Sequence, residues 1–291
     1  MEKDLSRQEK KKDKNNLENS LFVAVYDLQA VLSCPRGEAS GFYYLSKLSV
    51  YNFTICNLKD TKDVKCYVWY EGEGQRGVNE IGTCVFKYLQ ELEPKATAVG
   101  KSIDVVFYSD NCCGQQKNQF MIAMYRYAIK KLGFINSITH TFLIKGHTQN
   151  EGDSVHSVIE KNVSRTLKGG PIYTPDQYFT LIRTSKKTGQ PYQVIELTHE
   201  DFFDIKSLEA NLAFGNQNVK IGELRIVKLE KLYPNKMFYK TSFSEDDFSE
   251  IETKRITRRS NENNEVGQLF SLYDSKLPIN EKKEKRITYS I

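Results

Sequence analysis

The sequence lacks the long apolar runs that a membrane protein needs. Nowhere in its 291 residues does an apolar stretch approach the roughly 20 residues of a bilayer-spanning helix. The first twenty residues are charged and nearly free of apolar side chains, which excludes a signal peptide or an anchor at this end. We therefore expect a soluble globular protein with no membrane partner, nuclear or cytoplasmic and not secreted, and a disordered tail over residues 1–20.

Cysteine is also scarce, and its spacing carries no metal signature. The six cysteines, at positions 34, 56, 66, 84, 112 and 113, include no CxxC pair, and several lie inside apolar patterns. This argues against a disulfide framework and against a cysteine zinc site, so we expect free thiols. No zinc-finger or helix-turn-helix pattern precedes residue 21, and a module for recognising specific DNA ends is therefore not expected there.

The charge balance is mildly basic and unevenly distributed. A net charge of +5 permits an anionic partner without requiring one. Lys161, Arg165 and Lys168 recur at helical spacing, and the stretch KRITRR (254–259) holds four cations in six positions. Basic clusters of this kind are either solvated faces or contacts to nucleic acid.

Hydrophobic periodicity predicts an α/β fold. Unbroken apolar or β-branched runs predict strands, and apolar residues at helical spacing predict helices. The expected strands cover 21–27, 48–58, 64–70, 103–109 and 138–144, and the expected helices cover 79–92, about 120–132 and 153–168. The order β-β-β-α-β-α-β-α predicts a mixed five-stranded sheet with helices on both faces.

Two further features refine this picture. The second and third strands are expected to form a hairpin, with a bulge between Val50 and Tyr51, where the apolar phase slips. Signals weaken after residue 170. We therefore expect a core over 21–170 and an α+β extension with basic segments over 171–291.

Two of the buried strands end on an aspartate. Asp27 follows the run LFVAVY, and Asp110 follows VVFYS. In open α/β sheets, ligands bind beyond the carboxyl ends of the strands, so neighbouring parallel strands would bring these acids together. Two close carboxylates repel each other unless a cation lies between them. The pair predicts a Mg²⁺ or Mn²⁺ site, although either aspartate could simply cap the turn that follows it.

A third acid is expected from the helix over 153–168. Asp153, His156 and Glu160 lie at i, i+3 and i+7, on a face that we expect to be opposite the apolar one. Asp153 and Glu160 are about 10 Å apart along the helix, too far to bind one metal together. We favour Asp153 and keep Glu160 as the alternative. His156, and also His147, could flank the site and move a proton or contact phosphate, or could be structural.

Other motifs have weaker claims. GEGQRG (72–77) follows a strand and precedes a helix as a dinucleotide-binding loop would, but Glu71 and Glu73 would face the pyrophosphate and the acid expected about 20 residues later is absent. We expect His140 to be a core or edge residue. Cys112 and Cys113 read as small buried residues. Lys117 opens the next helix, at a position suited to an anion.

Several longer strings resemble a known family. YDLQAVL, YVWYEGEGQRGVNEIGTCVFKYL, YSDNCCGQQKN and GHTQNEGDSVHSVIEK are similar to a multicopy, transposon-associated family known mainly as a domain of unknown function. The resemblance covers residues 21 to 168 and extends weakly to PINEKKEKR. It implies a ribonuclease H-like fold of the kind found in DDE/D transposases and integrases.

The residues and the resemblance together define our expectations. The leading one is a transposase-derived protein that cleaves or joins DNA strands, with catalytic residues Asp27, Asp110, Asp153, Glu160 and His156. Asp27, Asp110 and Asp153 would hold the metal, while Lys117, Lys161, Arg165 and Lys168 would contact phosphates. The alternatives are a domesticated, non-catalytic nucleic-acid-binding protein and a nicotinamide-dependent oxidoreductase that uses GEGQRG. The choice between DNA and RNA, retained activity and homo-oligomer formation stay open.

Overall fold

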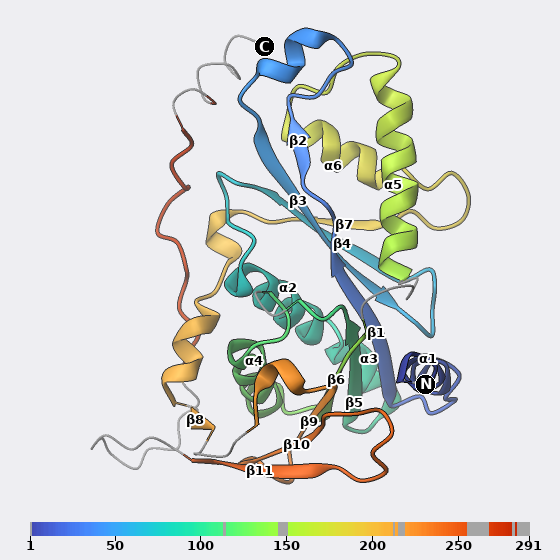
Figure 1. Cartoon of the computed structure of the whole chain (residues 1–291), viewed down its shortest axis with the longest axis vertical. Helices are drawn as coiled ribbons and strands as arrows, with labels where there is room; N and C mark the ends of the chain where they lie inside the picture. The colour runs from blue at the N-terminus through green and yellow to red at the C-terminus, as the bar shows by residue number, and fades with distance from the viewer. Residues whose placement is uncertain are drawn as a thin grey trace. The chain divides into compact units, whose positions relative to one another are not determined.

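The computed structural model describes residues 2–112, 115–144, 151–211, 213–214, 219–254, 268–280 and 283. They form a mixed α/β fold divided into two units whose segments alternate along the chain (Figure 1). The first unit comprises Met1–Ala24, Gly77–Thr148 and Phe203–Phe270, and the second comprises Val25–Arg76, Gln149–Phe202 and Ser271–Ile291. None of the helices in the described ranges is both long enough and apolar enough to span a membrane.

The first unit is built on a mixed sheet that begins with the first half of strand β1 (Leu21–Leu28). Strand β5 pairs in parallel with β6, and the strands that follow pair antiparallel in the order β6-β9-β10-β11-β8. The bounds are α1 Glu2–Lys14, α2 Val78–Gln90, α3 Glu93–Val99, β5 Ile103–Ser109, α4 Gln119–Lys131, β6 Ile135–Phe142, η3 Ile205–Asn211, β8 Ala213–Phe214, η4 Ile221–Glu223, β9 Ile226–Glu230, β10 Lys236–Lys240 and β11 Ser249–Lys254.

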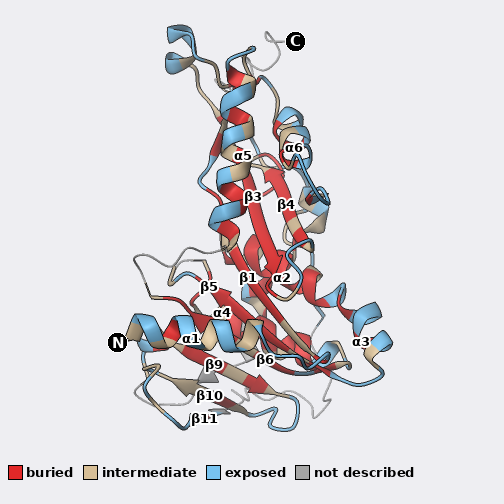
Figure 2. Cartoon of the chain, turned by 90° about the vertical axis from the view of Figure 1, so that its right-hand side faces the viewer, coloured by how far each residue is buried: buried red, intermediate tan, exposed pale blue. Residues whose placement is uncertain are grey.

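The second unit contains the second half of β1 and a smaller set of strands. β3 pairs antiparallel with both β2 and β4, and β7 adds in parallel to β4. The bounds are β2 Leu32–Cys34, η1 Ser40–Tyr44, β3 Leu48–Asn57, β4 Val64–Tyr70, α5 Glu151–Leu167, α6 Pro175–Arg183, β7 Gln193–Glu196 and η2 His199–Asp201. Figure 2 shows β3 and β4 buried, while α5 presents one buried and one exposed face.

Local sequence explains why most predicted elements form. The strands predicted over 64–70 and 103–109 have those bounds, and the hairpin of β3 with β4 is confirmed. The predicted bulge is wrong, because the register runs unbroken from the pair Val50–Tyr70 through Tyr51–Trp69 to Cys56–Val64. The helix predicted over 79–92 is α2, and a short helix that was not predicted, α3, follows it. Pro94 occupies the first turn of α3, where its missing N–H costs nothing.

The N-terminal segment corrects another expectation. Residues predicted to be a disordered tail form helix α1, with Glu2 and Asp4 in its first turn and three lysines in its last, an arrangement that complements the helix dipole. Ser6 is buried, and the Asp13 carboxylate accepts a hydrogen bond from the Tyr108 hydroxyl at 2.6 Å. Contacts within the first unit therefore stabilise this helix, although its own sequence has only a weak apolar pattern.

The predicted core and extension are not separate bodies. Of the segment predicted as an extension, α6 and β7 belong to the second unit, and β9, β10 and β11 belong to the first. β7 adds to β4, and β9 adds to β6, so strands from the predicted extension complete the sheet portions of both units. Edge strands expose unpaired backbone groups, and these late strands satisfy them.

One close packing contact in the second unit yields a stability prediction. A Cβ atom on Gly74 would lie 2.7 Å from a ring carbon of Phe202, which is fully buried and stacks edge-on against Trp69. We expect Gly74→Ala to lower the free energy of unfolding by about 1–3 kcal/mol through overpacking. Urea titration followed by the fluorescence of Trp69, the one tryptophan of the chain, measures this loss. Gly41→Ala, whose Cβ would meet no atom within 4 Å, is the matched control and should change little.

Candidate metal centre

Asp27 lies near the end of β1, in the part of the strand that belongs to the second unit. The four residues before it are buried, while Asp27 itself is half-buried. One carboxylate oxygen, Oδ1, accepts a hydrogen bond from the backbone N–H of Leu28 at 2.9 Å. The other oxygen, Oδ2, lies 3.8 Å from Nδ1 of His156.

Helix α5 brings two more candidate ligands to Asp27. Asp153, in the first turn, is exposed, and His156 is buried one turn later. One ligand atom from each of Asp27, Asp153 and His156 lies within 4.8 Å of the others. The i, i+3 spacing in α5 places the carboxylate and the imidazole on adjacent turns, where both can reach the same point.

A buried hydrogen bond fixes the imidazole. Nε2 of His156 lies 3.0 Å from Oγ1 of Thr54, a fully buried residue of β3, and that hydroxyl lies 3.8 Å from the Cys66 thiol. Burial lowers the pKa of His156 to about 4, although the nearby Asp153 carboxylate opposes the shift. The ring is therefore neutral at pH 7. In the tautomer that donates from Nε2 to Thr54, the Nδ1 lone pair is available on the side of Asp27, as a metal ligand requires.

The donor set suits a divalent cation. Two carboxylates and one neutral imidazole combine oxygen ligands, which Mg²⁺ and Mn²⁺ prefer, with a nitrogen that Mn²⁺ accepts more readily than Mg²⁺. These residues fit the cation that the sequence predicts, with His156 as a ligand that was expected only to flank it. Since His156 is buried, the expectation that it shares a face opposite the apolar side of α5 is wrong.

Glu160 does not belong to this cluster. Its Oε1 accepts a hydrogen bond from Nε2 of Gln29 at 3.3 Å, and Oε1 of Gln29 accepts from Nδ2 of the buried Asn52 at 2.9 Å. Glu160 thus connects α5, through Gln29, to Asn52 of β3. Of the two alternatives for the third acid, the structure groups Asp153 with Asp27.

Asp110 belongs to the first unit, beyond the end of β5. It is exposed, and its Oδ1 accepts a hydrogen bond from the backbone N–H of Cys112 at 3.2 Å, which is the turn-capping role considered above. The cluster of Asp27, Asp153 and His156 lies in the second unit. A metal-binding role for Asp110 stays a prediction from the sequence.

The expected phosphate contacts differ in exposure. Lys161 and Arg165, on the second half of α5, and Lys168, directly after its last residue, are exposed. Lys117 is buried instead: its ammonium group donates to the carbonyl oxygen of Gly222 at 2.7 Å and lies 5.1 Å from the ring centre of Phe142. We therefore remove Lys117 from the expected contacts, because its charge is satisfied inside the first unit.

The remaining expected residues have structural surroundings or lie outside the described ranges. His140 is buried in the first unit, with Nε2 2.8 Å from the Ser109 hydroxyl and Nδ1 3.2 Å from the Tyr125 hydroxyl. Cys112 is a free thiol of intermediate burial. His147, Cys113 and residues 255–259 of the basic stretch fall outside the described residues.

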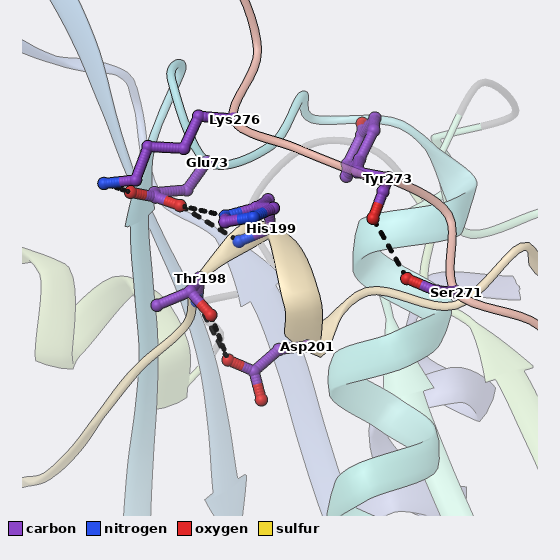
Figure 3. Close-up of polar contacts among 7 residues, drawn as sticks. All are labelled: Glu73, Thr198, His199, Asp201, Ser271, Tyr273 and Lys276. Atoms are coloured by element: carbon purple, nitrogen blue, oxygen red, sulfur yellow. Dashed lines mark hydrogen bonds and ion pairs between the residues drawn. The ribbon is translucent and has the colours of Figure 1, made fainter.

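The glutamate of GEGQRG is held in a polar network (Figure 3). One carboxylate oxygen of Glu73, buried apart from 6% of its side chain, lies 2.8 Å from Nζ of Lys276. The other accepts hydrogen bonds from the backbone N–H and Nδ1 of His199, both at 3.0 Å. Burial tends to raise the pKa of Glu73, but these hydrogen bonds outweigh it and lower that pKa to about 2.

The start of α2 is likewise unsuited to a pyrophosphate. The Glu80 carboxylate accepts a hydrogen bond from the backbone N–H of Gly77 at 2.8 Å, so an acid already occupies the helix N-terminus. The carboxylates of Glu73 and Glu80 would each repel a phosphate. Nothing in this geometry favours the dinucleotide alternative.

Sequence reasoning missed Thr54 and Gln29, which hold His156 and Glu160. Both are buried polar residues, Thr54 within the apolar run of β3 and Gln29 after the apolar run of β1. A polar residue predicted to be buried needs a hydrogen-bond partner, and this was the available signal. The identity of the partner, a helix about a hundred residues later, is not readable from that signal.

Comparison with known proteins places the chain in a family. Residues 54–243 match the family described as a domain of unknown function, DUF7869, and the chain belongs to that family. No curated protein matches the sequence. The crystal structure of the N. crassa QDE-2 AGO MID-PIWI domains is similar at 19% identity and a TM-score of 0.25, over 48% of this chain and 42% of that one. A likeness at this level does not establish a shared fold or function.

Proposed function

We propose that this chain is a ribonuclease H-like protein of transposase type that carries out metal-dependent phosphoryl transfer on nucleic acid, with DNA as the expected substrate. The observation that carries the proposal is the cluster of Asp27, Asp153 and His156, whose ligand atoms lie within 4.8 Å of one another. It joins the end of one strand to the first turn of a later helix. The strings that resemble a transposon-associated family support this assignment.

The cluster assigns separate roles to its three residues. Asp27 and Asp153 would hold Mg²⁺ or Mn²⁺ through their carboxylates, and His156 would complete the set through Nδ1. When bound, such a cation activates an attacking water or 3′-hydroxyl and stabilises the leaving oxygen. Thr54 keeps the imidazole in one orientation, and the exposed cations of α5 would contact phosphates.

Metal binding by matched variants tests the cluster. We expect Asp27→Asn and Asp153→Asn to bind Mn²⁺ at least roughly tenfold more weakly than the wild type, because each loses a charged ligand. Glu160→Gln, on the same helix but bonded to Gln29, should keep the wild-type affinity. Titration followed by Mn²⁺ electron paramagnetic resonance measures all four proteins, and equal affinities would contradict the site.

Activity is tested separately. The wild type should cleave labelled DNA in Mn²⁺ or Mg²⁺, both Asp variants should fall to background, and Glu160→Gln should stay active. Asp110→Asn belongs in the same series, because a loss of cleavage would support the role that the sequence predicts for it. Mn²⁺ binding without cleavage of DNA or RNA would reject the enzyme and favour the non-catalytic nucleic-acid-binding protein, whose affinity should fall steeply with salt.

A further inference from the structure

The second unit exposes a pair of aromatic rings near the end of α5. Tyr43 and Tyr44, in η1, are 81% and 80% exposed, and their rings meet edge to face with centres 5.3 Å apart. Single exposed apolar side chains are common, but two adjacent exposed rings form a continuous surface on which another ring can stack. Neighbouring Phe42 anchors the segment, with its ring centre 6.0 Å from that of Tyr173.

This aromatic pair lies close to the basic end of α5. Arg36, just before η1, pairs with Ile172, just after α5, through two backbone hydrogen bonds of 2.8 Å. Figures 1 and 2 both show the segment between β2 and β3 at the C-terminal end of α5. The fold thus joins the exposed rings and the last turns of α5 at one end of the second unit.

The neighbouring turns of α5 carry charge of one sign. Between residues 161 and 168, KNVSRTLK, there are three cations and no carboxylate. Lys161, Arg165 and Lys168 lie at i, i+4 and i+7 and are all exposed, so they form one outward stripe. From Asp153 to Leu167, the last residue of α5, the helix rises about 21 Å, and the stripe therefore leads from the metal cluster toward the tyrosines.

We propose that Tyr43 and Tyr44 stack on unpaired bases of a single-stranded nucleic acid whose phosphates lie along Lys161, Arg165 and Lys168. Exposed aromatic rings beside a cationic track are the combination that single-strand binders use, because every base has a face that can stack. A duplex keeps its base faces stacked internally, so it offers phosphates and base edges but no face on which the tyrosines could stack. This inference rests on the proposed function and specifies the form of its substrate, an unpaired strand.

The test compares oligonucleotides of equal charge. Anisotropy of a labelled 20-mer of thymidine is compared with that of an abasic 20-mer, which has the phosphates but no bases. We expect the wild type to bind the thymidine strand more tightly, and Tyr43→Ala/Tyr44→Ala to weaken that binding by roughly tenfold or more while leaving abasic binding unchanged. Tyr43→Phe/Tyr44→Phe, which keeps both rings, should bind like the wild type.

Control variants separate stacking from charge. Phe270→Ala, which removes an aromatic ring 65% exposed in the first unit, should leave binding unchanged. Lys161→Ala/Arg165→Ala/Lys168→Ala should weaken both strands and reduce the salt dependence. These exposed positions leave the core intact, so folding does not confound them.

Four results would overturn the proposal. They are equal binding of the thymidine and abasic strands by the wild type, no effect of the Tyr→Ala pair, no binding of any strand, and a change of oligomeric state in the Tyr→Ala pair that marks the rings as a contact between copies. Base-dependent binding by a protein that cleaves nothing would uphold this inference and reject only the enzymatic function. Cleavage without base-dependent binding would do the reverse.

Discussion

The free energy of unfolding should fall by about 4 kcal/mol between pH 7 and pH 5, with each of two buried histidines contributing roughly 2 kcal/mol. Burial lowers the pKa of His140 to about 3, helped by the charge of Lys117, and burial lowers the pKa of His156 to about 4 despite Asp153. Both side chains stay neutral in the folded protein over this range. An unfolded chain takes up the protons near the ordinary histidine pKa of about 6.5.

The direction of the effect follows from these shifts. A group whose folded pKa is depressed favours the unfolded state as protons become available, so the stabilisation is complete above about pH 6.5 and is lost as the pH falls toward the folded values. His140 belongs to the first unit and His156 to the second. If the units unfold separately, each transition should lose about half of the total.

Chemical denaturation at the two pH values measures this loss. Far-ultraviolet circular dichroism follows both units, and the fluorescence of buried Trp69 reports on the second. His156→Gln removes one titrating group, so its loss between pH 7 and pH 5 should be roughly half that of the wild type, whatever its stability at pH 7. Unfolding free energies that agree at both pH values would contradict the prediction.

Glu73→Ala should destabilise the second unit by about 2 kcal/mol, because hydrogen bonds to a buried carboxylate are lost, and should loosen the segment that begins at Ser271. Glu73 is buried and binds both His199 and Lys276, which come from two later parts of the chain (Figure 3). The later segment is also held by backbone hydrogen bonds from Leu272 to Phe202 and from Leu277 to Gly72, both 2.8 Å long. Loss of the carboxylate leaves the His199 N–H groups without this acceptor.

Denaturation followed by Trp69 fluorescence measures the stability, and trypsin digestion measures the loosening. The variant should be cut after Lys276 faster than the wild type. Glu196→Gln is the matched control, because it breaks the 2.9 Å ion pair between Glu196 and Arg183, two side chains that are about half exposed. Exposed ion pairs contribute less than about 1 kcal/mol to stability. Equal losses in Glu73→Ala and Glu196→Gln would show that burial of Glu73 has no energetic weight.

Particular residues show which structural features could be predicted from the sequence. The apolar run before Asp27 predicted a buried strand, and the spacing of Asp153 and His156 predicted a shared helix, because both patterns reflect local geometry. The bulge at Val50 was wrong because β3 is buried on both faces, so apolar residues in either phase fit the same strand. Helix α1 was missed because its partners, such as Tyr108, come from later in the chain.

The sequence by itself determined the main strands and helices between residues 21 and 168 and their order, because the period of a strand or a helix shows in the spacing of neighbouring apolar side chains. Only the tertiary structure decided that Asp153 rather than Glu160 meets Asp27, that His156 turns inward to Thr54, and that Lys117 is buried. It also decided that β7 pairs with β4, more than a hundred residues earlier in the chain, and that β9 pairs with β6, about ninety residues earlier. These outcomes depend on contacts between distant segments, which local spacing does not encode.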